Sequence, residues 1–190
     1  REGPHADIVN EVVLRTQMQA HYSTDNLGHF GLNLMRYVHF TSPIRRYADL
    51  LVHRALVRAL GLGDDGLTDR DMAQMKDTAE LITHAERRAM AAERDATDRY
   101  VASFLSDRVG AEFDGRITGV TRFGLFIRLS ETGADGLVPV SNLGGEFFVH
   151  DDRMHALVGE RTGARWPLGM PVQVRLREAT PITGGLLFEM

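Results

Sequence analysis

The sequence predicts an α+β chain, with a helical part in residues 1–108 and a five-stranded antiparallel OB-fold barrel in residues 109–190. From residue 69 to about 107 there is no glycine or proline, which is typical of one long helix. After residue 110 the apolar residues recur with a period of two, which indicates strands with one buried face. The turn sequences ETGADG, RTG and PITGG separate about five strands, which favours a small barrel.

The composition is that of an ordinary globular protein, with 43% hydrophobic and 25% charged residues. The absence of cysteine excludes disulfides and thiolate metal sites. No apolar run is long enough to span a membrane, and the first residues lack the layout of a signal peptide, so we expect a cytoplasmic protein without a membrane partner. A net charge of −4 argues against general coating by nucleic acid, so any such contact must be local.

The first well-defined helix is predicted from Pro43 to about Leu60, after a region of turns and short apolar runs. Ser42 is the expected N-cap, and GLGDDG supplies the C-cap and the following loop. Two arginines, Arg45 and Arg46, then fall in the first turn. Cations are disfavoured there because the helix dipole leaves partial positive charge at the N-terminus, so a negative group is expected beside them.

A phosphate would satisfy this requirement, since free N–H groups and arginines form a receptor for an anion. Tyr47, Asp49 and His53 follow within two turns, and Asp49 is spaced to orient one of the arginines. The alternative is that Arg46 and Asp49 form an exposed surface pair while Arg45 extends along the surface. The spacing alone leaves both interpretations open.

The long helix carries an apolar stripe that we expect to be buried. Glu86 and Glu93 fall on the same stripe, where a carboxylate must be paired or lie beside a polar cavity. The apolar members of the stripe are Met72, Met75, Ala79, Ile82, Ala89, Ala96 and Tyr100.

The barrel is expected to present an aromatic and basic outer face. In FGLFIRLS, alternation turns Phe126 and Arg128 outward, and Arg122 and Phe123 precede them. Aromatic rings that stack on bases, beside arginines that contact phosphates, are typical of single-stranded RNA-binding surfaces. Alternatively, Phe123 packs under a loop or Phe126 packs against the helical part.

The EFFVHDD segment contains Phe147, Phe148 and His150, which would extend this face. Core packing is nevertheless expected for one of the two phenylalanines. No metal ligands are predicted. The eight histidines lack HxxxH or HExxH spacing, and the acidic pairs at 64–65 and 151–152 fall in expected surface loops.

Several motifs together resemble the RNB exoribonuclease family, which includes the RNase II and RNase R types. HFTSPIRRYADLLVHRAL, with the upstream QAHYSTDNLGHFGLNL, is similar to the closing part of the RNB catalytic domain, and HAERRAMAAERDATDRY agrees with the helix that follows it. GRITGVTRFGLFIRL and DGLVPVS resemble an S1 domain, the OB-fold at the C-terminus of RNase R-type enzymes. The resemblance covers residues 8–190 and favours the RNase R type.

The resemblance implies processive hydrolysis of single-stranded RNA from the 3′ end, with Mg²⁺ in the site and nucleoside 5′-monophosphates as products. It assigns Arg45 and Arg46 to the phosphate at the scissile bond and Glu86 to the 3′-terminal nucleotide. The RNA contacts are then expected from Tyr47, Arg122, Phe123, Phe126, Arg128, Phe148 and His150.

Two departures from the family pattern limit this expectation. The aspartates that bind Mg²⁺ in the family have no counterpart here, so the chain is expected to be inactive without the remaining RNB core and the cold-shock domains. Pro139 also stands where S1 domains commonly have histidine. The alternatives are a non-catalytic S1-type RNA-binding protein and a helical adaptor whose barrel binds protein.

Overall fold

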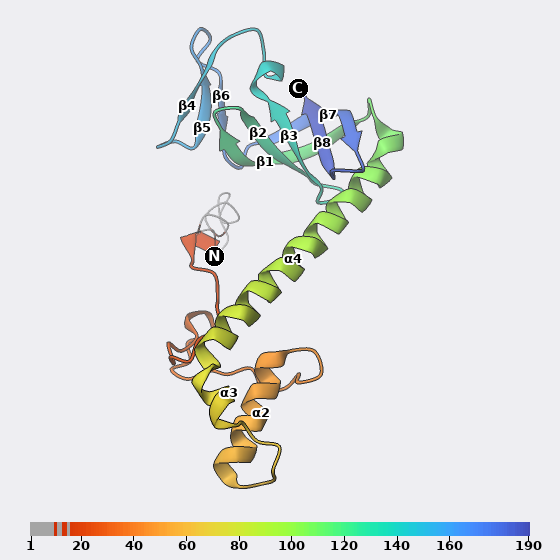
Figure 1. Cartoon of the computed structure of the whole chain (residues 1–190). Helices are drawn as coiled ribbons and strands as arrows, with labels where there is room; N and C mark the ends of the chain where they lie inside the picture. Colours follow the sequence, from red (N-terminus) through yellow and green to blue (C-terminus); the bar gives the residue numbers. More distant parts are fainter. Residues whose placement is uncertain (1–9, 11–12, 15) are drawn as a thin grey trace. The chain divides into compact units, whose positions relative to one another are not determined.

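The computed structural model describes residues 10, 13–14 and 16–190, which form two compact units (Figure 1). One unit contains residues 18–91 and is mainly helical. The other contains residues 92–190, with the described residues before position 18, and holds the β-strands. The division falls within the helix α4 (Met75–Leu105), so this helix contributes to both units.

In the helical unit, the short 3₁₀-helix η1 (Phe30–Leu32) precedes α2 (Tyr47–Leu60). The predicted start of α2 at Pro43 is wrong, and the N-cap is Arg46. The backbone N–H groups of Arg45 and Arg46 instead donate to the Ser42 carbonyl at 3.2 and 3.0 Å, which closes a turn before the helix. The predicted end at Leu60 is confirmed, because Gly61 adopts a left-handed conformation with φ of 63°.

The predicted single helix over residues 69–107 is divided into α3 (Asp69–Ala73) and α4, followed by the 3₁₀-helix η2 (Ser106–Arg108). Thr68 begins α3 with a capping box in which its hydroxyl accepts from the Asp71 backbone and its N–H donates to the Asp71 carboxylate. The break falls at Gln74, which has φ of −96° and ψ of 5° and so leaves the helical conformation.

The expected burial of the α4 stripe is confirmed only at its beginning. Ala79 is buried and Ile82 is half-buried, whereas residues 84–100 are all exposed. The prediction that Glu86 and Glu93 lie at core-facing positions is therefore wrong. The three- and four-residue spacing correctly predicted a helix. The stripe, however, is covered by other side chains only near Ala79 and again from residue 101.

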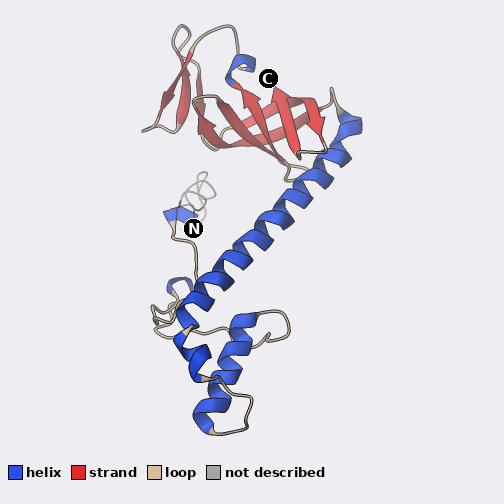
Figure 2. Ribbon diagram, in the orientation of Figure 1, coloured by secondary structure: helices blue, strands red, loops and turns tan. Residues whose placement is uncertain are grey.

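The second unit is built on the predicted five-stranded barrel, and Figure 2 draws the strands of this unit in red. The barrel closes in the order β1-β2-β3-β8-β7. Neighbouring strands are antiparallel except for β3 and β8, which are parallel. The five strands are β1 (Glu112–Thr121), β2 (Gly124–Leu129), β3 (Asp135–Pro139), β7 (Pro171–Thr180) and β8 (Gly185–Glu189).

The barrel core confirms the predicted alternation. Leu125, Ile127 and Leu129 are buried, whereas the residues between them face outward. The last turns of α4 join this core, since Ala102 and Leu105 are fully buried among the barrel side chains. The end of the helix therefore completes the barrel.

A second, three-stranded sheet was not predicted from the sequence. It contains β4 (Phe148–Asp151), β5 (Ala156–Gly159) and β6 (Arg165–Pro167), after the 3₁₀-helix η3 (Val140–Asn142). The Glu146 carboxylate holds the β5–β6 turn by accepting from the backbone N–H groups of Arg161 and Thr162 at 2.8 and 3.0 Å. Hydrogen bonds from Thr162 keep the pKa of Glu146 below its ordinary value.

Among the helices that the structure describes, none combines the length and the apolar character needed to cross a membrane.

Candidate functional site

The first candidate region is the arginine turn, residues 42–46, together with the first turn of α2. Asp49 lies at the third position of α2 and is fully buried. One of its carboxylate oxygens, Oδ1, accepts from the Ser42 N–H at 2.7 Å and from Arg46 Nη2 at 3.0 Å. Asp49 thus ties the turn to the helix, and it supplies the negative group expected beside Arg46.

These contacts separate the two arginines. The Arg46 side chain is 24% exposed and pairs with Asp49, so the pair is neither wholly on the surface nor free for a ligand. Arg45 is exposed, and among the described residues its guanidinium has no hydrogen-bond or ion-pair partner. Tyr47 is also exposed, at 51%. The side chains left available to a ligand at this end of α2 are therefore those of Arg45 and Tyr47.

Asp49 is ionised in this arrangement. Burial by itself would raise the pKa of its carboxyl group, but the hydrogen bonds from Ser42 and Arg46 outweigh burial, with a smaller contribution from the charge of Arg46. The pKa of Asp49 therefore lies below its ordinary value. The turn consequently contains a stable pair of opposite charges beside one uncompensated positive charge.

Tyr22 connects the arginine turn region to α4. Its hydroxyl lies 2.9 Å from His39 Nδ1, and its backbone N–H donates to the Thr83 hydroxyl at 3.0 Å. Burial, followed by the charge of Glu86, raises the pKa of Tyr22. Glu86 is therefore an exposed carboxylate beside Tyr22, in the same unit as the arginine turn.

The second candidate region is the aromatic face of the barrel, defined as Arg122, Phe123 and Phe126. The exposed fractions of Phe123 and Phe126 are 58% and 38%, and their ring centroids lie 6.0 Å apart at an interplanar angle of 86°. Arg122, which precedes Phe123, is also exposed. Two partly exposed rings beside an arginine form a surface on which bases can stack.

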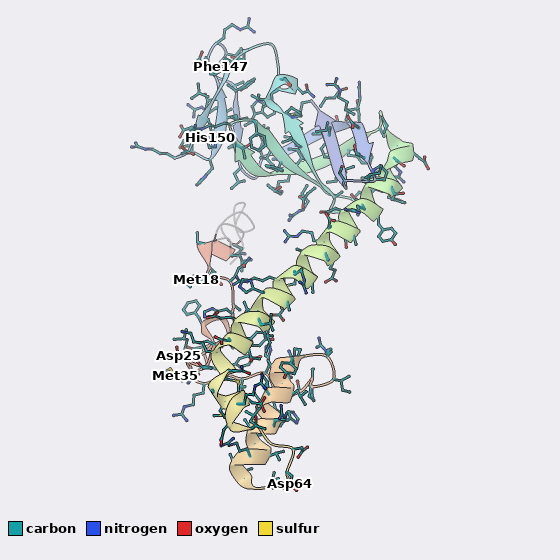
Figure 3. All side chains as sticks on the ribbon, in the orientation of Figure 1. Met18, Asp25, Met35, Asp64, Phe147 and His150 are labelled. Atoms are coloured by element: carbon teal, nitrogen blue, oxygen red, sulfur yellow. The ribbon has the colours of Figure 1, made fainter. Side chains whose placement is uncertain are left out.

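The structure changes the interpretation of three other predicted RNA contacts. Phe148 is 6% exposed and packs in the core, so its predicted contact with RNA is wrong, and its neighbour Phe147 is the exposed ring at 71%. The side chain of His150 is only 15% exposed, and its Nδ1 lies 3.1 Å from Asp152. Figure 3 labels Phe147 and His150, both at the small sheet.

Arg128, the third of these residues, faces outward as predicted but is paired. Its Nε and Nη2 donate to the two carboxylate oxygens of Asp135 on the neighbouring strand, both at 3.0 Å. This bidentate pair neutralises the positive charge that the aromatic face was expected to gain from Arg128.

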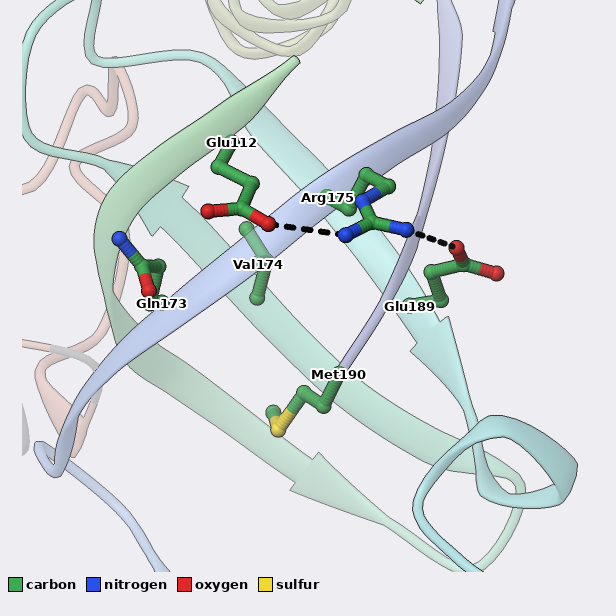
Figure 4. A pocket seen from close by; sticks show the side chains of 6 residues that line it. All are labelled: Glu112, Gln173, Val174, Arg175, Glu189 and Met190. Carbon is green, nitrogen blue, oxygen red and sulfur yellow. Dashed lines mark hydrogen bonds and ion pairs between the residues drawn. The ribbon is translucent and has the colours of Figure 1, made fainter. Parts of the chain in front are cut away.

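A pocket of about 240 Å³ lies on another part of the barrel (Figure 4). Arg175 occupies it between two carboxylates, 2.9 Å from Glu112 and 3.8 Å from Glu189, so its charge is compensated. The pocket is lined by Glu112, Gln173, Val174, Arg175, Glu189 and Met190. None of these residues was predicted to contact RNA.

The donor set for a metal ion is missing from the part of the chain that the structure describes. No three histidine, aspartate or glutamate side chains there are grouped so that they could hold a metal ion. The described residues therefore do not fit the Mg²⁺ that the family resemblance implies, and we assign no step of catalysis to a metal held by them.

Sequence reasoning gave no role to Tyr22 and His39, which link the arginine turn region to α4. The two residues are 17 positions apart, and Tyr22 reaches Thr83 across 61 positions. Sequence periodicity cannot predict such contacts, because they join residues far apart in the chain. The only sequence signal was that both residues occur in the motifs that resemble the RNB family.

Comparison with known families divides the chain in the predicted order. Residues 1–61 match the RNB domain, and residues 106–161 match the S1 RNA binding domain. Ribonuclease R 1 of Lactococcus lactis is 44% identical over 191 residues, which covers 98% of this chain and 23% of that protein. Ribonuclease R of Escherichia coli is 41% identical over 181 residues, which covers 91% of this chain and 22% of that protein.

The same relationship appears among solved structures. The apo form of Mycoplasma genitalium RNase R superposes with a TM-score of 0.91 and 31% identity, covering all of this chain and 30% of that one. Its complex with ribose-methylated single-stranded RNA gives the same values. The chain thus spans less than a quarter of the length of each of the two curated relatives. By these matches the chain is a relative of ribonuclease R, in which an RNB-domain segment is followed by an S1 RNA-binding domain.

Proposed function

We propose that this chain is part of a processive 3′-to-5′ exoribonuclease that hydrolyses single-stranded RNA to nucleoside 5′-monophosphates. The observation that carries the proposal is the 44% identity to a ribonuclease R over nearly the whole chain, which includes both the arginine turn and the aromatic face. In this proposal the helical unit contributes to the catalytic domain, and the barrel guides the substrate.

The arginine turn contributes a cation for the RNA backbone. Arg45 is exposed and unpaired among the described residues, and it lies at the start of α2, where the helix dipole favours an anion. A phosphate near the bond to be cleaved gains negative charge in the transition state, so a positioned arginine stabilises that state more than the bound substrate. Glu86, beside Tyr22, is proposed to act near the 3′-terminal nucleotide.

The barrel contributes an RNA-guiding surface. Phe123 and Phe126 offer ring faces to bases without reading their sequence, and the exposed Arg122 is available to a phosphate. Such a surface suits a processive enzyme because it holds the strand and lets it advance. In two of the solved neighbours, Mycoplasma genitalium RNase R is bound to single-stranded and to double-stranded RNA, which supports RNA as the ligand class.

The metal chemistry is assigned to a part of the enzyme outside this chain. We propose that Mg²⁺ is held by carboxylates of the remaining RNB core, since the described residues here do not provide a ligand group. When bound, Mg²⁺ would supply charge stabilisation and an activated water. The residues of this chain bind and orient the RNA.

An exposed apolar segment, residues 27–44, is proposed to pack against that remaining RNB core. Phe30, Met35 and Ile44 are 92%, 89% and 102% exposed, which is costly for large apolar side chains. Figure 3 labels Met35 in this segment. The relatives contain about four times as much chain, enough to provide the covering surface.

A non-catalytic S1-type RNA-binding protein is the second candidate function. It is favoured by one observation: the aromatic face is complete within this chain, whereas a metal site is not present in its described part. Both functions predict RNA binding by the barrel, and only the first requires the arginine turn to act on the bond that is cleaved.

The test is a time course of this chain with Mg²⁺ and 5′-labelled single-stranded RNA, beside a binding titration with the same RNA. We expect binding without shortening, and shortening from the 3′ end when the chain is part of the complete enzyme. If the complete enzyme binds RNA but never shortens it, the second function is correct. If neither form binds RNA, both are wrong.

A further inference from the structure

We infer that Asp49 is a positioning residue that holds Arg46 inside the helical unit, so that Arg45 alone provides the phosphate contact of the arginine turn. Two adjacent arginines of one motif thus have different tasks. The inference deepens the proposed function and rests on it, because it states which side chain of the turn meets the RNA.

The first support is the geometry at Asp49 Oδ1. This oxygen accepts from the Ser42 N–H at 2.7 Å and from the Arg46 guanidinium at 3.0 Å, which joins the beginning and the end of the arginine turn. Asp49 is fully buried and belongs to the first turn of α2. One buried carboxylate therefore holds the backbone before Arg45, at Ser42, and the side chain after it, at Arg46.

The second support is a pair of unsatisfied atoms. Asp49 Oδ2 and Arg46 Nε are buried and have no hydrogen-bond partner among the residues that the structure describes, although one accepts and the other donates. The two residues already share the hydrogen bond from Nη2 to Oδ1, so closing the pair to a bidentate fork would satisfy both atoms at once. The Nε–Nη2 edge of Arg46 is therefore matched to Asp49, which leaves the Nη1 donors as the part of the guanidinium outside this pair.

The third support is the charge of the turn. The aspartate occupies the N-terminal end of α2, where an anion is favoured, and compensates Arg46. Arg45 has no such partner among the described residues. An incoming phosphate therefore meets one compensated arginine and one free arginine.

Salt dependence of RNA binding distinguishes the two arginines. Each phosphate contact on a single strand contributes about 0.7 to the slope of log affinity against log salt concentration. We would titrate fluorescein-labelled oligouridylate with the 190-residue chain and with two variants. Arg45→Gln should lower the slope by about 0.7. The double variant Arg46→Gln/Asp49→Asn should keep the slope of the original chain.

The double variant is chosen because it preserves the net charge and removes both members of the buried ion pair together. The amide introduced by Asp49→Asn would still offer an oxygen to the Ser42 N–H, and no unpaired charge would remain inside the helical unit. Arg70→Gln, which removes an exposed arginine of α3, is the matched control for the loss of one charge. It should change the slope less than Arg45→Gln does.

Thermal unfolding tests the positioning role separately. Arg46→Gln alone leaves a buried carboxylate unpaired, so its unfolding midpoint should fall below that of Arg45→Gln, and adding Asp49→Asn should recover much of the loss. A midpoint for Arg46→Gln equal to that of Arg45→Gln would overturn the role of Asp49.

Two slope results would also overturn the inference. A decrease in the double variant equal to that of Arg45→Gln would mean that Arg46 meets phosphate. Unchanged slopes in all variants that still bind RNA would mean that neither arginine does. In both cases the proposed function of the barrel survives, whereas absence of RNA binding by the original chain would contradict that function itself.

Discussion

The aromatic face of the barrel and the arginine turn are held in place by different means. Phe126 projects from a strand whose alternate residues, Leu125 and Ile127, are fully buried in a closed sheet. The arginine turn is closed by two backbone hydrogen bonds to the Ser42 carbonyl and is tied to α2 by the buried carboxylate of Asp49. A surface carried by a packed sheet should lose one contact for each surface residue changed, whereas a turn that depends on one buried group should lose its shape when that group is changed.

The largest expected effect separates two adjacent residues of the barrel unit, Phe147 and Phe148. Phe148→Ala should reduce the free energy of unfolding by about 3–5 kcal/mol because it empties a core position. Phe147→Ala is the matched control, and its effect should stay within about 0.5 kcal/mol, since the ring is exposed. Urea titration followed by circular dichroism measures both. Equal effects would contradict the assignment of Phe148 to the core.

The next effect concerns the arginine turn within a complete enzyme. Arg45→Ala in a full-length ribonuclease R that carries this segment should lower kcat by about 10²–10³-fold, because a positioned cation acts on charge that develops in the transition state. KM for the RNA should change less. Steady-state kinetics on a single-stranded substrate gives both constants. A change confined to KM would show that Arg45 binds RNA without contributing to the reaction.

A smaller effect is expected for the aromatic face. Phe126→Ala in the 190-residue chain should weaken RNA binding by about 1–3 kcal/mol if one base stacks on the ring, with little change in the fold. Fluorescence anisotropy measures the affinity, and circular dichroism checks that the strands remain. Unchanged affinity would favour the interpretation of the barrel as a protein-binding module.

The smallest effect is a dependence of stability on pH. A different carboxylate should cause it in each of the two units. The pKa values of Asp49 and Glu146 are lowered in the folded chain, so each carboxylate stabilises its unit above about pH 4, and this contribution is lost as the pH falls through the lowered pKa. Thermal unfolding between about pH 2 and 6 should therefore show decreasing stability on acidification.

Two matched variants show which carboxylate causes the decrease in stability in each unit. Asp49→Asn should flatten the pH dependence of the helical unit, and Glu146→Gln should flatten that of the barrel unit. The helical signal in circular dichroism reports mainly on the first, and the fluorescence of Trp166 in β6 reports on the second. An unaltered pH dependence in either variant would contradict the assignment for that unit.

The barrel was predictable because its signal is local. Each strand residue alternates between the core and the surface, so the sequence alone assigned Leu125, Ile127 and Leu129 to the core. The same rule stated that one of two adjacent phenylalanines faces inward, but it could not state which. That choice depends on the small three-stranded sheet, whose strands of three or four residues are too short for a periodic signal.

The arginine turn was less predictable because its geometry depends on longer contacts. The Ser-Pro sequence favours a helix start at Pro43, yet the Ser42 N–H is held by a carboxylate seven residues later, and a turn forms instead. The spacing indicated that Asp49 could orient an arginine, but it carried no information on its burial. Likewise, the apolar stripe predicts which face of α4 is buried, but it cannot state over what length of the helix other side chains cover that face.

The burial of Ala102 and Leu105 in the barrel has a practical consequence for anyone who shortens this chain. A version beginning at residue 109, where the period of the sequence changes, would lose two fully buried side chains and leave apolar barrel residues open to water. Such a fragment should express poorly or aggregate. A version that keeps α4 from residue 92 onward retains both buried side chains of the barrel core. We expect this shortened chain to yield a well-behaved RNA-binding domain.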